Sequence, residues 1–164
     1  KLTIAVNVSA QQFKHPAFVE NIEKMLLHHQ VDPSRLKLEL TESVVLADIN
    51  DVVVKMKALK ALGVSLSMDD FGTGYSSLSY LKQLPIDQIK IDQSFVRDMT
   101  FDSNDKIMVQ TIISMAENFG LNVIAEGVET DEQLIILKQL GCLTYQGYLF
   151  GKPVTIENFE ALLN

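Results

Sequence analysis

The chain lacks most of the features that organise secreted or membrane-spanning proteins. Its 164 residues include one cysteine, Cys142, so neither a disulfide framework nor a cysteine-based zinc site organises the fold, and a reducing compartment is expected. No uninterrupted apolar run reaches the roughly 18 residues that cross a bilayer, and the first residues do not have the pattern of a signal peptide. We expect a cytoplasmic location, with any membrane anchor supplied by another part of a larger protein.

Positive charge is also scarce, because 14 Lys and Arg residues stand against 21 Asp and Glu, for a net charge of -7. Nucleic-acid polymers and anionic membranes bind basic surfaces, so neither is expected as a broad partner. The acidic side chains suit cations instead. A hydrophobic content of 47% and the absence of a low-complexity linker predict one soluble domain over residues 1–164.

Strand patterns and helix patterns alternate along the chain. Six segments place apolar residues at every second position and a polar residue near the C-terminal end: 4–8, 36–40, 64–69, 89–92, 123–126 and 143–146. Helical spacing is found at 17–29, 48–62, 77–82, 104–119, 131–140 and 156–163. Asp131 and the pair Ser103-Asn104 are typical N-caps, and the helices are expected to end at Gly63, Gly120 and Gly141.

This alternation implies right-handed crossovers and a parallel sheet, either doubly wound or closed into a barrel. Central strands of doubly wound sheets are nearly continuous apolar runs, whereas these strands carry polar residues at alternate positions. We therefore predict an α/β fold, a (β/α)8 TIM-like barrel with six of its eight strands in this chain and two more before Lys1. In a barrel the polar residues would meet at one rim.

Five oxygen-bearing side chains end these strands: Asn7, Glu39, Asp69, Asp70 and Glu126. Asp69 and Asp70 are adjacent and point in different directions, which suits two hard cations that prefer oxygen ligands. The alternative is a turn with a solvated carboxylate ahead of Gly72. Burying several carboxylates together without cations costs about several kcal/mol each, so their convergence favours a metal pair.

Lys90 and Asp92 share one parity on the predicted fourth strand. A lysine among carboxylates can orient a water or stabilise charge on a phosphoryl group, and the alternative is an interior ion pair that only fills the barrel. Gln146 is equally open between a hydrogen bond to a water or ligand oxygen and an amide that fills the barrel. The residue types alone do not decide between these roles.

Six motifs together resemble the EAL-domain cyclic di-GMP phosphodiesterases. They are Asn7-Val8-Ser9, Glu39-Leu40-Thr41-Glu42, the run from Asp69 to Gly74, Lys90-Ile91-Asp92, Ala125-Glu126-Gly127-Val128-Glu129, and Gln146-Gly147-Tyr148 with Lys152-Pro153. The resemblance spans essentially the whole chain in the family's order and spacing. It corresponds to about the last two-thirds of a complete EAL domain.

The resemblance implies hydrolysis of cyclic di-GMP to linear pGpG by water that two Mg²⁺ or Mn²⁺ ions activate. It implies Asn7, Glu39, Asp69, Asp70 and Glu126 as the metal ligands. It further implies that Lys90 and Gln146 position the water, Asp92 supports Lys90, Glu42 orders the loop from Phe71 to Tyr75, and Glu129 supports the ligand set.

The family's Glu-Ala-Leu motif belongs to the strand expected before Asn7, and this chain does not supply that strand. Activity is therefore expected of the complete domain. The alternative function is a catalytically inactive cyclic di-GMP receptor or a protein-interaction module. By analogy with relatives, Tyr75, Leu78 and Tyr80 are expected to contribute to a homodimer, although an amphipathic helix packed on its own barrel explains them equally well. Sensory or signalling domains are expected upstream.

Overall fold

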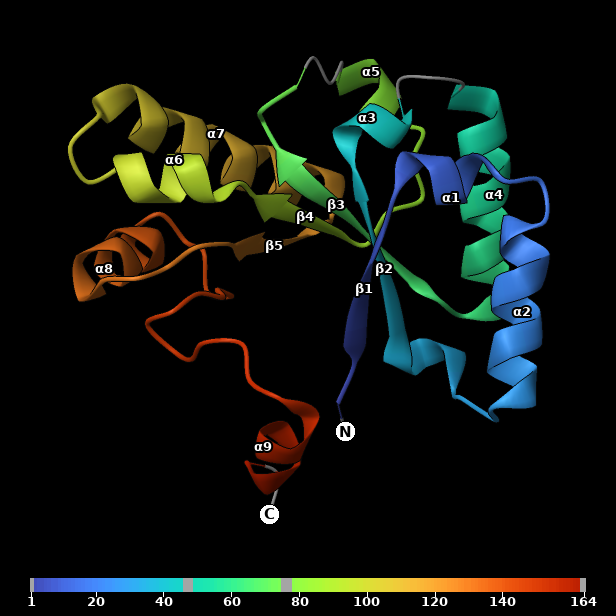
Figure 1. The fold of residues 1–164 in the computed structure, drawn as a ribbon. Coiled ribbons are helices and arrows are strands. Elements are labelled where there is room, and N and C mark those ends of the chain that lie inside the picture. Colours follow the sequence, from blue (N-terminus) through green and yellow to red (C-terminus); the bar gives the residue numbers. More distant parts are fainter. Residues whose placement is uncertain (1, 46–48, 75–77, 163–164) are drawn as a thin grey trace.

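The computed structural model describes residues 2–45, 49–74 and 78–162. In chain order its elements are β1 (Ile4–Val8), α1 (Ala10–Lys14), α2 (Phe18–His28), the 3-10 helix η1 (Pro33–Arg35), β2 (Leu36–Thr41), α3 (Glu42–Val45), α4 (Ile49–Leu62), β3 (Ser65–Phe71), α5 (Leu78–Leu81), β4 (Gln88–Ile91), α6 (Gln93–Asp98), α7 (Ser103–Phe119), β5 (Asn122–Ala125), α8 (Asp131–Gln139) and α9 (Ile156–Ala161). Figure 1 shows α9 apart from the other helices. None of the helices in these ranges is long and apolar enough to span a bilayer.

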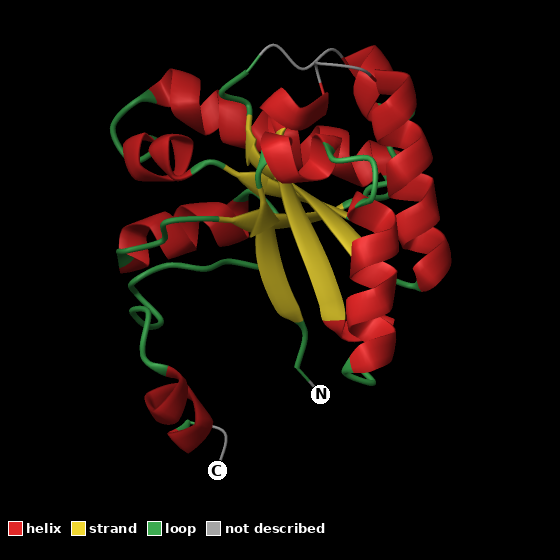
Figure 2. Ribbon diagram, turned by 45° about the vertical axis from the view of Figure 1, so that its right-hand side comes forward, coloured by secondary structure: helices red, strands yellow, loops and turns green. Residues whose placement is uncertain are grey.

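The strands form one parallel sheet in the order β1-β2-β3-β4-β5, so each strand lies beside the next one in the sequence. Asn7 pairs in register with Glu39, and Thr41 pairs with Asp69. This strictly sequential order is that of a barrel wall and not of a doubly wound sheet, whose strand order reverses. Within the described ranges β1 and β5 are the two edges of an open sheet (Figure 2).

Alternate residues of the central strands are buried against the helical layer. Leu38, Leu66 and Ile89 are at most 1% exposed, and they share the core with residues of α4 and α7, which lie beside the sheet in Figure 1. The residues of opposite parity are buried as well although they are polar, and they comprise Glu39, Ser67, Asp69, Gln88 and Lys90. The predicted alternation of apolar and polar faces is therefore confirmed for β2, β3 and β4.

The predicted strand at residues 143–146 is wrong as a full strand. The chain there forms only an isolated parallel bridge between Tyr145 and Ala125, and Gln146 N donates to Ala125 O at 2.8 Å. Leu143 is 74% exposed, and within the described residues no further strand pairs with the outer side of this segment. A segment that pairs with one neighbour at a single residue does not form the continuous hydrogen bonds of a β-strand.

Two N-caps lie one residue earlier than predicted, and the predicted glycines Gly63, Gly120 and Gly141 follow the ends of α4, α7 and α8. Thr130, not Asp131, is the N-cap of α8, where its hydroxyl accepts from Gln133 N in a capping box. Asp102 caps α7 by accepting from Asn104 N at 2.7 Å. Gly120 ends α7 in the left-handed conformation, with φ of 69°. The short helices α1, α3 and α6 were not predicted, since each follows a strand end too closely to show helical periodicity.

Candidate functional site

The polar ends of four strands meet around one lysine. The ammonium Nζ of Lys90 on β4 lies 2.7 Å from Glu39 Oε2 of β2, 2.9 Å from Asp69 Oδ1 of β3 and 2.8 Å from Glu126 Oε1, just after β5. Parallel strands place their C-terminal ends at the same edge of the sheet, and the inward parity turns these side chains together. The Lys90 side chain is only 4% exposed, so the contacts lie out of bulk water.

Three carboxylates around one ammonium leave negative charge in excess. Burial disfavours the charged form of Lys90, but its hydrogen bonds to Glu126, Glu39 and Asp69 outweigh that effect and hold its pKa above the usual value. The pKa of Glu126 is raised to about 7, mainly by burial and also by the nearby Asp69, against the opposing effect of Lys90. One carboxyl group of the cluster is therefore partly protonated near neutral pH.

Asp70 joins this cluster through an unusual backbone conformation. Its φ is 53°, in the left-handed region that residues other than glycine rarely adopt. Its carboxylate can contribute an oxygen within 4.8 Å of oxygens from Asp69 and Glu126. Burial, Asp69 and Asp92 together raise the pKa of Asp70. A strained residue held beside like charges is typical of a functional position.

Glu42, the first residue of α3, holds the loop that follows these aspartates. Its side chain is buried, and its Oε1 accepts a hydrogen bond from Gly72 N at 3.0 Å. A Cβ atom on Gly74 would lie 2.1 Å from Glu42 Oε2, so the loop passes Glu42 with no space for a side chain. Glu42 was predicted to order the loop from Phe71 to Tyr75, and the last residue of that loop, Tyr75, lies outside the described residues.

A polar cavity of about 280 Å³ opens beside the cluster. Its lining residues are Asp70, Gln93, Glu126, Gly127, Glu129, Gln146, Gly147 and Tyr148. Gln146 Nε2 donates to Glu126 Oε1 at 3.0 Å, which ties the predicted glutamine to the carboxylate cluster. Gln93 was not singled out from the sequence, although its place directly after the Lys90-Ile91-Asp92 run was an available signal.

Asp92 and Glu129 lie near the cluster without joining the contacts of Lys90. β4 ends at Ile91, and Asp92 caps α6 by accepting hydrogen bonds from Ser94 N at 2.8 Å and from Ser94 Oγ. The ion pairs that Lys90 makes within the described residues go to the three carboxylates above, and Asp92 is not among them. The side chain of Glu129 is exposed at the cavity, while its backbone N donates to Gln133 Oε1.

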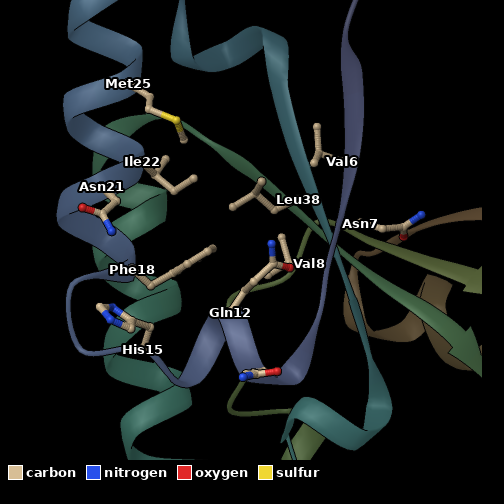
Figure 3. A pocket seen from close by; sticks show the side chains of 11 residues that line it. Val6, Asn7, Val8, Gln12, His15, Phe18, Asn21, Ile22, Met25 and Leu38 are labelled. Carbon is tan, nitrogen blue, oxygen red and sulfur yellow. The ribbon is translucent and has the colours of Figure 1, made fainter.

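Asn7 lies on the same face of the sheet as the cluster but is exposed at the β1 edge. It pairs in register with Glu39. Figure 3 shows its side chain on the opposite side of β1 from Val8 and Leu38, which line an apolar groove of about 500 Å³ between β1 and α2. Asn7 also lines that groove, but among the described residues no carboxylate does, so the carboxylate cluster lies elsewhere.

The donor set suits divalent cations. Asp69, Asp70 and Glu126 offer hard oxygen ligands within bonding reach of one ion, and Glu39 borders them through Lys90. One lysine beside the four carboxylates of Glu39, Asp69, Asp70 and Glu126 does not neutralise the cluster. Added positive charge would stabilise the ionised carboxylates.

One sequence feature lies away from the site. The tripeptide Glu160-Ala161-Leu162 occurs at the end of α9, so it does not supply a strand residue at the rim. Tyr75 and the side chain of Leu78, expected at a homodimer surface, lie outside the described residues, and Tyr80 is 40% exposed. The homodimer stays a prediction.

Comparisons with known proteins agree with this geometry. The family model of the EAL domain matches residues 1–153. The chain is 45% identical over 158 residues to the bifunctional diguanylate cyclase/cyclic di-GMP phosphodiesterase MucR of Pseudomonas aeruginosa, covering 96% of this chain and 23% of MucR. The chain thus spans less than a quarter of that relative.

Solved structures give the same result. The structure of the MucR phosphodiesterase in complex with c-di-GMP matches with a TM-score of 0.92 and 44% identity, over 96% of this chain and 64% of that one. The structure of BlrP1 from Klebsiella pneumoniae with manganese and cyclic di-GMP matches with a TM-score of 0.84 and 34% identity, over 92% of this chain and 39% of that one. The predicted α/β, TIM-barrel-like class is confirmed, and the chain belongs to the EAL domain family.

Proposed function

We propose that this chain carries the catalytic rim of a phosphodiesterase that hydrolyses cyclic di-GMP to linear pGpG with Mg²⁺ or Mn²⁺. The observation that carries the proposal is the convergence of Glu39, Asp69 and Glu126 on Lys90, beside Asp70 and an open polar cavity. Names of the similar proteins support the substrate, because MucR was solved with c-di-GMP and BlrP1 with manganese and cyclic di-GMP.

We assign the cation ligands to the five oxygen donors predicted from the sequence, namely Asn7, Glu39, Asp69, Asp70 and Glu126. Two bound cations would lower the pKa of a water that attacks phosphorus and would offset the charge of the phosphate. Two features support this assignment. Carboxylate oxygens of Asp69, Asp70 and Glu126 lie within 4.8 Å of one another, and the cluster carries more negative than positive charge.

The remaining residues orient the reactants. Lys90, already hydrogen-bonded to three carboxylates, is placed to orient the attacking water and to stabilise charge on the phosphoryl oxygens. Gln146 holds Glu126 from the cavity side and faces the same space. Glu42 fixes the loop that follows Asp70, Asp92 caps α6, and Glu129 lines the cavity.

The decisive test is turnover by the full-length protein that contains these residues. We expect pGpG to form from cyclic di-GMP with Mg²⁺ or Mn²⁺, and to be lost after Asp69→Asn, which removes one charge from the rim. The matched control is Glu20→Gln, which alters an exposed carboxylate on α2 that pairs with Lys24, and it should retain full turnover. Chromatographic separation of cyclic di-GMP and pGpG measures both.

The same experiment separates an enzyme from a receptor. Calorimetric binding of cyclic di-GMP with no pGpG, in protein shown to be folded and saturated with metal, would replace the enzyme by a cyclic di-GMP receptor. Absence of both binding and turnover would leave a protein-interaction module.

A further inference from the structure

Three carboxylates surround the ammonium group of Lys90. An ammonium group has three N–H donors and no acceptor. Here Lys90 Nζ donates to Glu39 Oε2 at 2.7 Å and forms ion pairs with Asp69 Oδ1 at 2.9 Å and Glu126 Oε1 at 2.8 Å. Lys90 Nζ therefore sits among oxygen ligands as a bound cation would, with only 4% of its side chain exposed.

The three carboxylates repel one another, so a positive charge is needed to hold them close together. Removing one partner of a buried ion pair is strongly destabilising because the remaining charge has neither water nor a partner. Around Lys90 three partners would lose their counter-charge at once, and Asp70 adds a fourth acidic group close to two of them. Lys90 is thus the positive charge that keeps the rim assembled within the described residues.

We propose that Lys90 is an internal counter-ion of the metal-free protein that exchanges with divalent cations when they bind. The inference rests on the proposed function, because it concerns the same rim. Asp69 and Glu126 belong both to the contacts of Lys90 and to the three carboxylates that can share an ion. A divalent cation that binds the oxygens of Asp69 and Glu126 competes with the ammonium group of Lys90. Lys90 therefore holds the carboxylates in place before the cation binds, but it lowers their affinity for the cation.

The exchange predicts opposite effects of Lys90→Met on the two states of the protein. Without metal the variant should melt below wild type, because its carboxylates repel one another with no counter-charge. With saturating Mn²⁺ the melting temperature should rise by more than it does in wild type, since the ion then supplies the missing charge. The Kd for Mn²⁺ should fall by about tenfold or more, the effect of removing one competing charge at short range.

Lys55→Met is the matched control. Lys55 is also a buried lysine, on α4, but it donates to the carbonyl oxygens of Phe13 and Lys14 and pairs with Asp51. Its loss should lower the melting temperature equally with EDTA and with Mn²⁺. Lys90→Arg keeps the charge and should lie closer to wild type than Lys90→Met in both conditions.

The measurements are melting temperatures of the full-length protein in EDTA and in Mn²⁺, together with calorimetric titration of Mn²⁺. If Lys90→Met folds only when Mn²⁺ is present, the exchange is supported. If Lys90→Met folds in neither condition, the neutral variant Lys90→Gln decides: an Mn²⁺-induced rise no different from that of Lys55→Met would overturn the proposal. A rise for Lys90→Met equal to or below that of wild type would also overturn it.

This outcome is independent of catalysis. Protein that binds Mn²⁺ as expected but forms no pGpG would refute the proposed phosphodiesterase and leave the exchange standing. Equal Mn²⁺ responses of Lys90→Met and wild type would refute the exchange and leave the phosphodiesterase standing.

Discussion

Gly74→Ala tests how tightly Glu42 holds the loop after Asp70. The added methyl carbon would lie 2.1 Å from Glu42 Oε2, whereas carbon and oxygen atoms in contact lie about 3.3 Å apart. The carboxylate must therefore retreat by roughly 1 Å. Its Oε1 now accepts from Gly72 N at 3.0 Å, so a shift of that size breaks the hydrogen bond.

The expected cost follows from that bond. A hydrogen bond to a charged group contributes about 1.5–3 kcal/mol, and at about 2–4 °C per kcal/mol for a domain of this size the melting temperature should fall by about 3–12 °C. Thermal and urea unfolding measure the loss. Gly151→Ala is the control, because an added Cβ there meets nothing within 4 Å, and it should change stability by less than about 0.5 kcal/mol.

A double-mutant cycle isolates the contact. In a Glu42→Ala background the carboxylate is gone, so Gly74→Ala should cost much less than it does in wild type. Additive effects of the two substitutions, or a Gly74→Ala protein as stable as wild type, would refute the reasoning that the loop is packed against Glu42.

Three further predictions concern the same rim. Asp70→Gly should raise the free energy of unfolding by up to about 1 kcal/mol, since glycine accepts the left-handed φ of 53° without strain, and should abolish Mn²⁺ binding in calorimetry. The pKa of Glu126 in the folded state is raised to about 7, so its contribution to stability is present at low pH and is lost as pH rises through 7. Metal-free Glu126→Gln should therefore gain stability over wild type between about pH 5 and pH 8. A difference in melting temperature between the two proteins that does not change with pH would contradict this. Gly147→Ala would place a carbon 2.2 Å from Val128 O, an atom of the backbone, and should displace the segment that carries Gln146, with reduced turnover and a lower melting temperature; turnover and melting like those of wild type would count against this close approach.

Local sequence patterns determined the elements and the face of each strand. Alternation of apolar and polar residues placed Glu39, Asp69 and Lys90 on the inner face, and the structure confirms that they meet there. The order of strands and helices likewise indicated a sequential parallel sheet. These features depend on residues close together in the chain, which is why they are legible without coordinates.

Only the tertiary structure decided which side chains bond to one another. The sequence alone left Lys90 open between a role at a water or phosphoryl group and an ion pair that fills the barrel. Its contacts with three carboxylates depend on strand register and on distances between residues far apart in the chain. Asp92 shares the parity of Lys90, yet β4 ends before it and α6 uses it as a cap. Residues 143–146 alternate between apolar and polar side chains like a strand, but they pair only at Tyr145. A β-strand also needs adjacent strands to pair with, and the tertiary structure decides whether they are there.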